Sequence, residues 1–342
     1  MAAKQQRPIP RAQMAAKNAD RPVPPKAKVK TAGKLQAVKP ATFGDWIAGA
    51  RPQTLVLAIV PVALGTATAS LLMENWYDHW VRALLALAVA VFLQIGVNYA
   101  NDYSDGVRGV DRDRVGPQRL VGSGRAKPRT VLTVALVFFG LAAVAGAILV
   151  WRSEQWWLLA VGALCFVAGW FYTGGKRPYG YLGLGEVAVF LFFGIVPVAG
   201  TMFTQVLTVN VEGWLAGVAA GALACAVLVA NNARDRERDQ VHGKRTLAVL
   251  LGDRGSRALY VLLLVVPYAV LAFFALFYEP STGTGYAPYV YFSAVAAAPA
   301  ILIAVTAKTA REWVLVMKLT LLTTALFGLG LAVAIAAPTI VG

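Results

Sequence analysis

The stretch of sequence that decides the fold of this protein is Asn98-Tyr-Ala-Asn101-Asp102-Tyr-Ser-Asp105-Gly-Val-Arg108-Gly-Val-Asp111. It follows the apolar run 83–97, so it stands where a membrane-spanning helix would end in a polar loop. On a helix Asn98, Asp102 and Asp105 lie at i, i+4 and i+7, which places an amide and two carboxylates on one face.

A comparable face follows the apolar run 215–230 and reads Asn232-Ala-Arg234-Asp235-Arg-Glu-Arg-Asp239. Carboxylates at the end of a membrane helix are costly unless they are paired, and they indicate a functional site by default. Two interpretations are open. Either the neighbouring arginines neutralise both faces in plain salt bridges, or the carboxylates hold Mg²⁺ while basic side chains bind phosphate oxygens.

The composition is that of an integral membrane protein. Of the 342 residues 58% are hydrophobic and only 14% are charged, with a mean hydropathy of +0.60. Apolar runs long enough to cross a bilayer recur, and they predict an all-α, polytopic bundle of about nine transmembrane helices. The expected spans are 54–73, 83 to the first acidic face, 131–151, 156–172, 184–206, 214–230, 258–278, 289–306 and 314–337.

Two details within the spans carry expectations of their own. Pro197 is expected to kink the fifth span, which neighbouring helices can accommodate. Glycines inside the spans permit close helix approach or an opening toward lipid, and the candidates are Gly140, Gly146, Gly194 and Gly200.

The net charge of +15 comes mostly from the N-terminal residues 1–43, which hold ten lysines and arginines but a single aspartate. This segment is rich in Ala and Pro and has almost no large apolar residues, so we expect a disordered basic tail, followed by a transmembrane domain over 44–342. The tail is expected to meet anionic lipid headgroups, and the charge does not indicate a nucleic-acid partner. Residues 43–51 are expected to form a helix at the membrane surface.

The loops alternate in charge and predict the orientation. Basic residues gather in the tail and in 104–130, 174–181, 234–257 and 307–312, whereas the opposite loops hold only Arg82 and Arg152. By the positive-inside rule the N-terminus and both acidic faces lie on the cytoplasmic side of a bacterial cell membrane.

With these two motifs the chain resembles the UbiA-type intramembrane prenyltransferases over about residues 44–337. The family carries two aspartate-rich motifs at the cytoplasmic mouth of a helical bundle. They correspond here to Asn101-Asp102-Tyr-Ser-Asp105 and Asp235-Arg-Glu-Arg-Asp239.

Within the family the chain is most similar to the branch that prenylates 1,4-dihydroxy-2-naphthoate. Three further stretches carry this likeness, at 109–124, 172–186 and 231–246, the last with Gly243-Lys244-Arg245-Thr246. Many members have a third acid four residues after Asp105; here that position is Gly109, with Asp111 two residues later, which leaves the role of Asp111 open.

The resemblance implies a Mg²⁺-dependent transfer of a polyprenyl group from its diphosphate to 1,4-dihydroxy-2-naphthoate, with loss of CO₂, in menaquinone biosynthesis. The implied catalytic and metal-binding acids are Asp102, Asp105, Asp235 and Asp239, with Asp111 as a further metal ligand. Implied partners of metal or diphosphate are Asn98, Asn101, Arg119, Lys176, Asn232, Arg234 and Lys244. An aromatic lining for the allylic cation is expected from Tyr99, Tyr103, Trp170, Phe171, Tyr172 and Tyr181, and Arg119 or Arg51 could bind the acceptor carboxylate.

Two alternatives stay open from the sequence. Another member of the superfamily would use a different acceptor, such as 4-hydroxybenzoate, homogentisate or haem, or would catalyse prenyl-phosphate glycosyl transfer. A cation-coupled transporter would place its carboxylates near the bilayer midplane in broken helices, whereas here they stand at helix ends beside many arginines. The sequence does not determine the oligomeric state or the prenyl chain length.

Overall fold

The computed structural model describes residues 39–75, 78–109, 119–175, 178–278 and 285–341. Within these ranges every regular element is a helix. The α-helices are α2 (Phe43–Ala50), α3 (Val56–Ser70), α4 (Trp80–Val107), α5 (Pro128–Ser153), α6 (Leu158–Thr173), α7 (Gly185–Phe190), α8 (Val196–Val206), α9 (Val211–Val241), α10 (Leu247–Phe273), α12 (Ala294–Thr306) and α13 (Ala310–Val341). Short 3₁₀ or π turns are η1 (Pro52–Thr54), η2 (Tyr179–Tyr181), η3 (Leu191–Ile195), η4 (Phe274–Tyr278) and η5 (Ala287–Ser293).

The chain is a multi-pass membrane protein, but the count of nine spans is not confirmed in the described part. Seven helices are long and apolar enough to cross a bilayer: 80–107, 128–153, 185–206, 211–241, 247–278, 287–306 and 310–337. An eighth span results if 43–54 and 56–70, which are bent by 44°, are taken together. The predicted fourth span is α6, whose 16 residues reach only about 24 Å at the α-helical rise, against a hydrocarbon core of about 30 Å.

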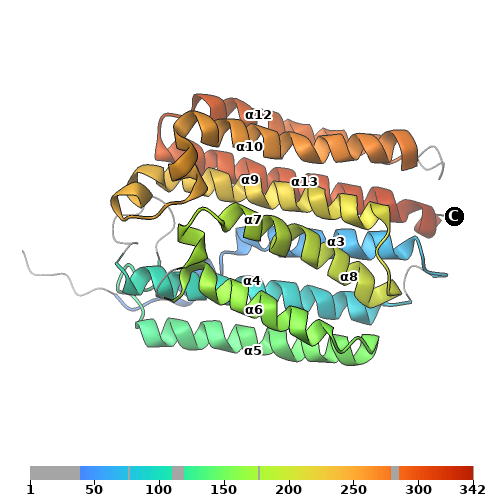
Figure 1. Ribbon diagram of the computed structural model, residues 1–342, viewed down its shortest axis with the longest axis horizontal. Coiled ribbons are helices and arrows are strands. Elements are labelled where there is room, and N and C mark those ends of the chain that lie inside the picture. Colours follow the sequence, from blue (N-terminus) through green and yellow to red (C-terminus); the bar gives the residue numbers. More distant parts are fainter. Residues whose placement is uncertain (1–38, 76–77, 110–118, 176–177, 279–284, 342) are drawn as a thin grey trace, which may run out of the picture. The chain divides into compact units, whose positions relative to one another are not determined.

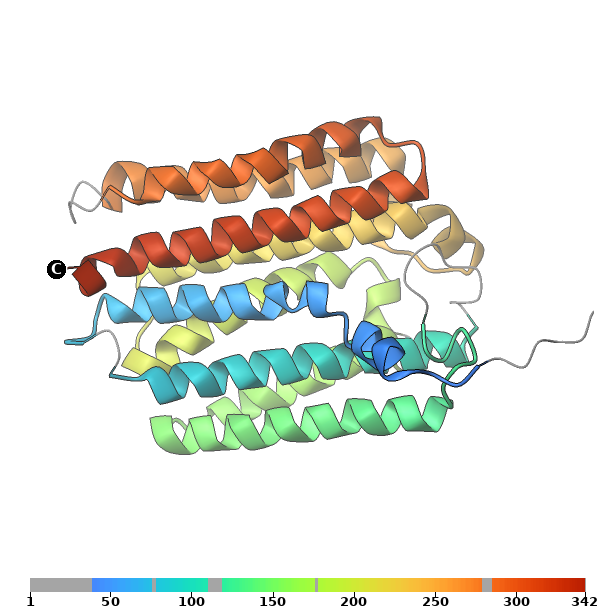
Figure 2. The ribbon, with the colours of Figure 1, turned by 180° about the vertical axis from the view of Figure 1, so that it is seen from behind.

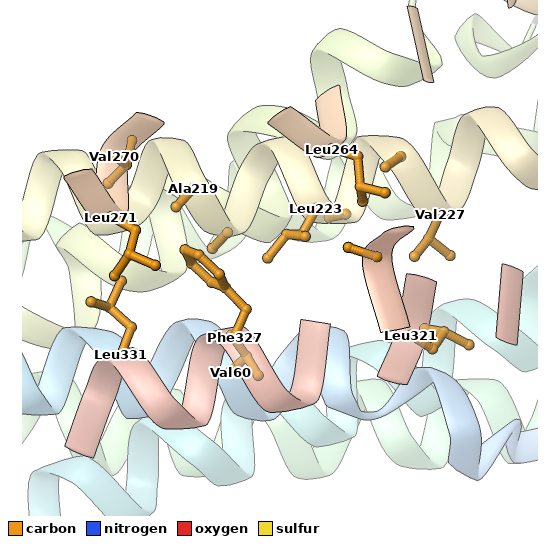
Figure 3. Packing of buried hydrophobic residues seen from close by; sticks show 14 of the residues in the cluster. Val60, Ala219, Leu223, Val227, Leu264, Val270, Leu271, Leu321, Phe327 and Leu331 are labelled. Carbon is orange, nitrogen blue, oxygen red and sulfur yellow. The ribbon is translucent and has the colours of Figure 1, made fainter. Parts of the chain in front are cut away.

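The long helices run side by side, as Figures 1 and 2 show, and α9 is the span with the largest buried share. It contacts α3, α7, α8, α10 and α13. Its inner faces carry many alanines and glycines, and such small residues let neighbouring backbones approach closely. Phe327 of α13 fills the space toward Ala219 and Leu223 of α9, with Val60 of α3 beside it (Figure 3).

Only one of the four glycines named for close approach acts in that way. A Cβ on Gly194 would lie 2.4 Å from the Cα of Gly221, so η3 and α9 touch through their backbones. Gly140 and Gly200 would meet nothing within 4 Å, and Gly146 only a methyl group of Val89 at 3.7 Å. Gly140 and Gly200 do not serve close approach, because a side chain at either position would not reach a neighbouring helix. For these two glycines the alternative, an opening toward lipid, stays a prediction.

The helix that leads to Pro197 widens into the π turn η3, directly before α8, whereas the predicted kink of this span stays a prediction. The Val196 N–H donates to the carbonyl of Leu191, five residues back. A π turn widens the helix where proline supplies no N–H and its ring would crowd the preceding turn.

The helix expected at 43–51 is present as α2 (Phe43–Ala50), and its location at the membrane surface stays a prediction. The Thr42 hydroxyl accepts from the Asp45 N–H at 3.2 Å, and the Asp45 carboxylate accepts from the Thr42 N–H at 2.8 Å. This capping box begins the helix. Arg51, with φ of 53°, ends it in the left-handed region before Pro52 and turns the chain into η1.

Candidate active site

A cavity of about 240 Å³ lies where the ends of α2, α4, α6 and α9 meet. The corresponding ends of α4 and α9 lie at the left of Figure 1. Along α9 its wall changes from Ala224 and Val227 to the polar residues between Asn231 and Asp239. Leu57, Val189, Phe193 and Met317 complete the apolar part. The cavity therefore has a charged mouth and an apolar interior, a shape that suits an amphiphilic ligand with an anionic head.

The cavity brings both acidic motifs together. Asp102 and Asp105 project from the last turns of α4, and Asp235 and Asp239 project from the last turns of α9. The four carboxylates face five cations in the cavity wall: Arg51, Arg119, Arg234, Arg238 and Lys244. Because cations outnumber carboxylates, the mouth favours an anionic ligand even before any metal is added.

Asp102 is anchored to the loop that follows α4. Its carboxylate, 1% exposed, accepts the backbone N–H of Leu120 at 2.9 Å and that of Val121 at 3.1 Å. These bonds fix the backbone directly after Arg119, whose side chain lines the cavity. Asp102 thus holds a cationic residue at the mouth, whatever else its remaining lone pairs bind.

Lys244 joins the two motifs. Its Nζ lies 3.7 Å from Asp105 Oδ1 and 3.9 Å from Asp239 Oδ1. The ring of Tyr181 lies beneath the ammonium at 4.3 Å, and the Tyr181 hydroxyl donates to Asp105 Oδ1 at 2.6 Å. Burial, and then the Asp105 carboxylate, raise the pKa of Tyr181, so this hydroxyl keeps its proton and remains a donor.

The two arginines of α9 that line the cavity have different partners. Arg234 donates from Nε and Nη2 to both oxygens of Asp235, at 2.9 and 2.6 Å, and from Nη2 to Asn231 at 2.8 Å. Arg238 lies one turn later, with Nη2 3.6 Å from Asp235. Its Nε and Nη1 are buried, and within the described residues they have no hydrogen-bond partner.

The predicted asparagines fasten helices to one another. Asn98 donates to the carbonyl of Ala50 at 2.9 Å, which ties α4 to the end of α2. Asn101 accepts from Thr173 at 2.6 Å, and Asn232 donates to Glu186 at 3.0 Å. All three side chains also line the cavity. Asp111 and Lys176 lie outside the described residues.

Of the six aromatics expected to line the cavity, Tyr172 and Tyr181 do so. Tyr99 instead packs against α2, where its hydroxyl donates to the Trp46 carbonyl at 2.6 Å. Tyr103 and Trp170 pack in the same apolar cluster as Tyr99. The Phe171 side chain is exposed. The expectation was wrong for these four because the rotation of α4 and α6 points them away from the cavity.

Three functional candidates were missed from the sequence. Arg238 stands four residues after Arg234 and so shares its helix face, a spacing that could have revealed it. Glu186 is a buried acid in the first turn of α7 whose oxygen accepts from Asn232. Gln94 lines the cavity one turn before Asn98, and its buried Oε1 has no partner in the part of the chain described.

The donor set fits Mg²⁺, which prefers carboxylate and amide oxygens. Asp105 and Asp239 already share one cation, the Lys244 ammonium, so their separation suits a common positive charge. No group of three acidic, histidine or cysteine side chains within the described ranges is arranged to hold a metal alone. Mg²⁺ commonly takes one or two protein carboxylates and completes its shell with substrate phosphates.

Comparison with known proteins gives a consistent result. The model of the UbiA prenyltransferase family matches residues 58–337. The chain is 55% identical over 240 residues to a 1,4-dihydroxy-2-naphthoate octaprenyltransferase of Mycobacterium tuberculosis, covering 70% of this chain and 80% of the relative. The enzyme of the same name from Escherichia coli is 41% identical, with 68% and 76% covered.

Solved structures share the fold. A UbiA homologue from Aeropyrum pernix superposes with a TM-score of 0.62 at 17% identity, over 81% of this chain and 97% of that one. A UbiA homologue from Archaeoglobus fulgidus bound to GPP and Mg²⁺ gives 0.58 at 14% identity, over 86% and 99%.

Proposed function

Because this chain belongs to the UbiA prenyltransferase family, we propose that it transfers a polyprenyl group from its diphosphate to 1,4-dihydroxy-2-naphthoate. The naphthoate acceptor is supported by the names of relatives that are 55% and 41% identical. The observation that carries the proposal is the cavity itself, in which two carboxylate motifs meet beside five cations and continue into an apolar interior.

The reaction breaks the allylic carbon–oxygen bond of the polyprenyl diphosphate, and the bonding electrons leave with the diphosphate. Charge therefore grows on the leaving group, and fixed cations aimed at it stabilise the transition state. The electron-rich naphthoate ring then attacks the allylic carbon, forms a carbon–carbon bond and loses its carboxyl group as CO₂. The product is demethylmenaquinol, an intermediate of menaquinone biosynthesis.

Asp105, Asp235 and Asp239 would hold Mg²⁺, with Asn101 and Asn232 as neighbouring oxygen donors. Bound Mg²⁺ would neutralise charge on the departing diphosphate. Lys244 lies between Asp105 and Asp239, where it can turn its ammonium from the carboxylates toward phosphate oxygens. Tyr181 holds Asp105 in place, and Asp102 holds the loop of Arg119.

The apolar wall of the cavity would keep water from the allylic cation. Tyr172 and Tyr181 are the aromatic residues of that wall, and their ring faces attract a cation. Exclusion of water prevents the cation from being captured as an alcohol before the naphthoate attacks.

We also propose an orientation. The mouth of the cavity lies at the end of the bundle that carries the basic loops, so it faces the cytoplasm of a bacterial cell by the positive-inside rule. The basic segment 1–43 would then meet the anionic headgroups of the same leaflet.

The test uses purified protein in detergent with 1,4-dihydroxy-2-naphthoate, a polyprenyl diphosphate and Mg²⁺, and detects the prenylated quinol and CO₂. Asp235→Asn and removal of Mg²⁺ should each abolish product, and 4-hydroxybenzoate should not replace the naphthoate. Product from 4-hydroxybenzoate but not from the naphthoate would overturn the acceptor. Full activity after chelation of Mg²⁺ would overturn the metal.

A further inference from the structure

The cavity wall contains two arginines from one helix, four residues apart, whose side chains have different partners. Arg234 is paired with Asp235 through two parallel hydrogen bonds and is almost completely buried, with 2% of its side chain exposed. A bidentate arginine–carboxylate pair in such a site holds its geometry, because breaking it would leave a buried charge without a partner. The Nε and Nη2 donors of Arg234 are therefore already used by Asp235.

Arg238 has the opposite arrangement. Its Nη2 stands at 3.6 Å from Asp235, longer than a hydrogen bond, while Nε and Nη1 are buried and have no partner among the residues described. Buried charged donors without a partner are rare, since each forfeits its hydration. Nε and Nη1 donate in different directions, and each can give a charge-assisted hydrogen bond to a phosphate oxygen.

We propose that Arg238, and not Arg234, is the α9 arginine that binds the diphosphate, and that Arg234 is a positioning residue that holds Asp235. The proposal rests on the proposed function and assigns a task to a residue that the sequence had not singled out. It also explains why arginine stands at this position between two acids. Arg238 brings two N–H donors to the leaving group on the same helix face that presents Asp235 and Asp239.

The experiment measures binding of inorganic diphosphate in the presence of Mg²⁺, by calorimetry on the full-length protein in detergent, and needs no acceptor. Arg238→Gln should weaken binding by about 10- to 150-fold, the range for a lost hydrogen bond to a charged group. Its melting temperature should stay at the wild-type value, because the side chain has no protein hydrogen bond at Nε or Nη1 to lose. The same variant should raise the KM for the polyprenyl diphosphate.

Arg234→Gln should behave differently. It removes the bidentate hydrogen bonds to the buried Asp235, so the melting temperature should fall and the Mg²⁺ concentration for half-maximal diphosphate binding should rise. Arg234→Lys should restore part of both, because it returns a positive charge to Asp235.

Arg236 is a matched control on the same helix. It pairs with Asp253 at 2.9 Å and does not line the cavity. Arg236→Gln removes the same charge and should leave diphosphate binding unchanged, which separates a direct contact from the general field of the helix.

Each outcome decides the matter. Unchanged diphosphate binding by Arg238→Gln, or an equal loss in Arg236→Gln, overturns the assignment of Arg238 and leaves the prenyltransferase proposal intact. A loss of binding in Arg234→Gln at an unchanged melting temperature overturns the division of roles. Failure of the wild-type protein to bind Mg²⁺ with diphosphate overturns the proposed function as well. If Arg238→Gln does not fold, Arg238→Met, which keeps the length of the side chain without its charge, takes its place, and unchanged binding there also refutes the proposal.

Discussion

Asp102→Asn tests whether this buried acid anchors the loop of Arg119. Both oxygens of Asp102 accept backbone N–H groups, from Leu120 at 2.9 Å and from Val121 at 3.1 Å. Asparagine has nearly the same volume but offers one acceptor oxygen and one NH₂ donor. One backbone N–H therefore loses a hydrogen bond to a charged group and faces another donor, a loss of about 1.5–3 kcal/mol.

At 1.4 kcal/mol for each factor of ten, that loss corresponds to an equilibrium constant for local opening of the loop that is about 10- to 150-fold larger. The direct assay is amide hydrogen exchange at Leu120 and Val121, measured in EDTA so that no metal contributes. Activity should fall as well, because Arg119 is attached to this loop and moves with it. Asp253→Asn serves as control, since that carboxylate lies outside the cavity and pairs with Arg236 and Arg257.

The reasoning is refuted if exchange at Leu120 and Val121 in EDTA equals that of the wild type while activity returns at high Mg²⁺. That result would show that Asp102 acts only as a metal ligand.

Three further predictions follow from single contacts. Tyr181→Phe removes the 2.6 Å hydrogen bond to Asp105 and should lower kcat/KM by about 10- to 150-fold; an unchanged Mg²⁺ dependence and rate would show that Asp105 needs no such support. Gly194→Ala puts a methyl group 2.4 Å from the backbone of α9 and should destabilise the protein by about 1–3 kcal/mol or more. The added methyl group of Gly200→Ala meets nothing within 4 Å and should not destabilise the protein. Equal melting temperatures for the two variants would therefore contradict the close contact of Gly194 with α9. Phe327→Ala, at a fully buried position, should cost about 3–5 kcal/mol in thermal or denaturant unfolding in detergent; a loss below 1 kcal/mol would mean that the core closes over the space.

Several features of the site were predictable from the sequence because they follow from spacing along single helices. Asp102 and Asp105 lie about one turn apart at the end of α4, and Asp235 and Asp239 lie about one turn apart at the end of α9, so spacing places each pair on one helix face. The meeting of the two pairs in one cavity depends on the tertiary structure. Lys244 was also predictable, since a short loop after α9 cannot carry it far from Asp239.

Other features depend on how helices rotate and cross. Tyr99 and Phe171 are as aromatic as Tyr172, yet only the last lines the cavity. Gly194 and Gly200 are both glycines in apolar surroundings, but only Gly194 meets another backbone. Sequence spacing gives the face of a helix that a residue occupies, but it does not determine which neighbouring element that face contacts.

The sequence by itself determined that the chain crosses the membrane several times, that its acids and bases gather at one end, and which family motifs it carries. The tertiary structure alone decided the partner of each charge: Asp102 with loop amides, Arg234 with Asp235, and Arg238 with two buried donors left for a ligand. The physical reason is the separation along the chain over which each effect acts. Apolar length and helical periodicity act within one segment, whereas hydrogen bonds and ion pairs depend on atoms from distant segments that meet within about 3–4 Å.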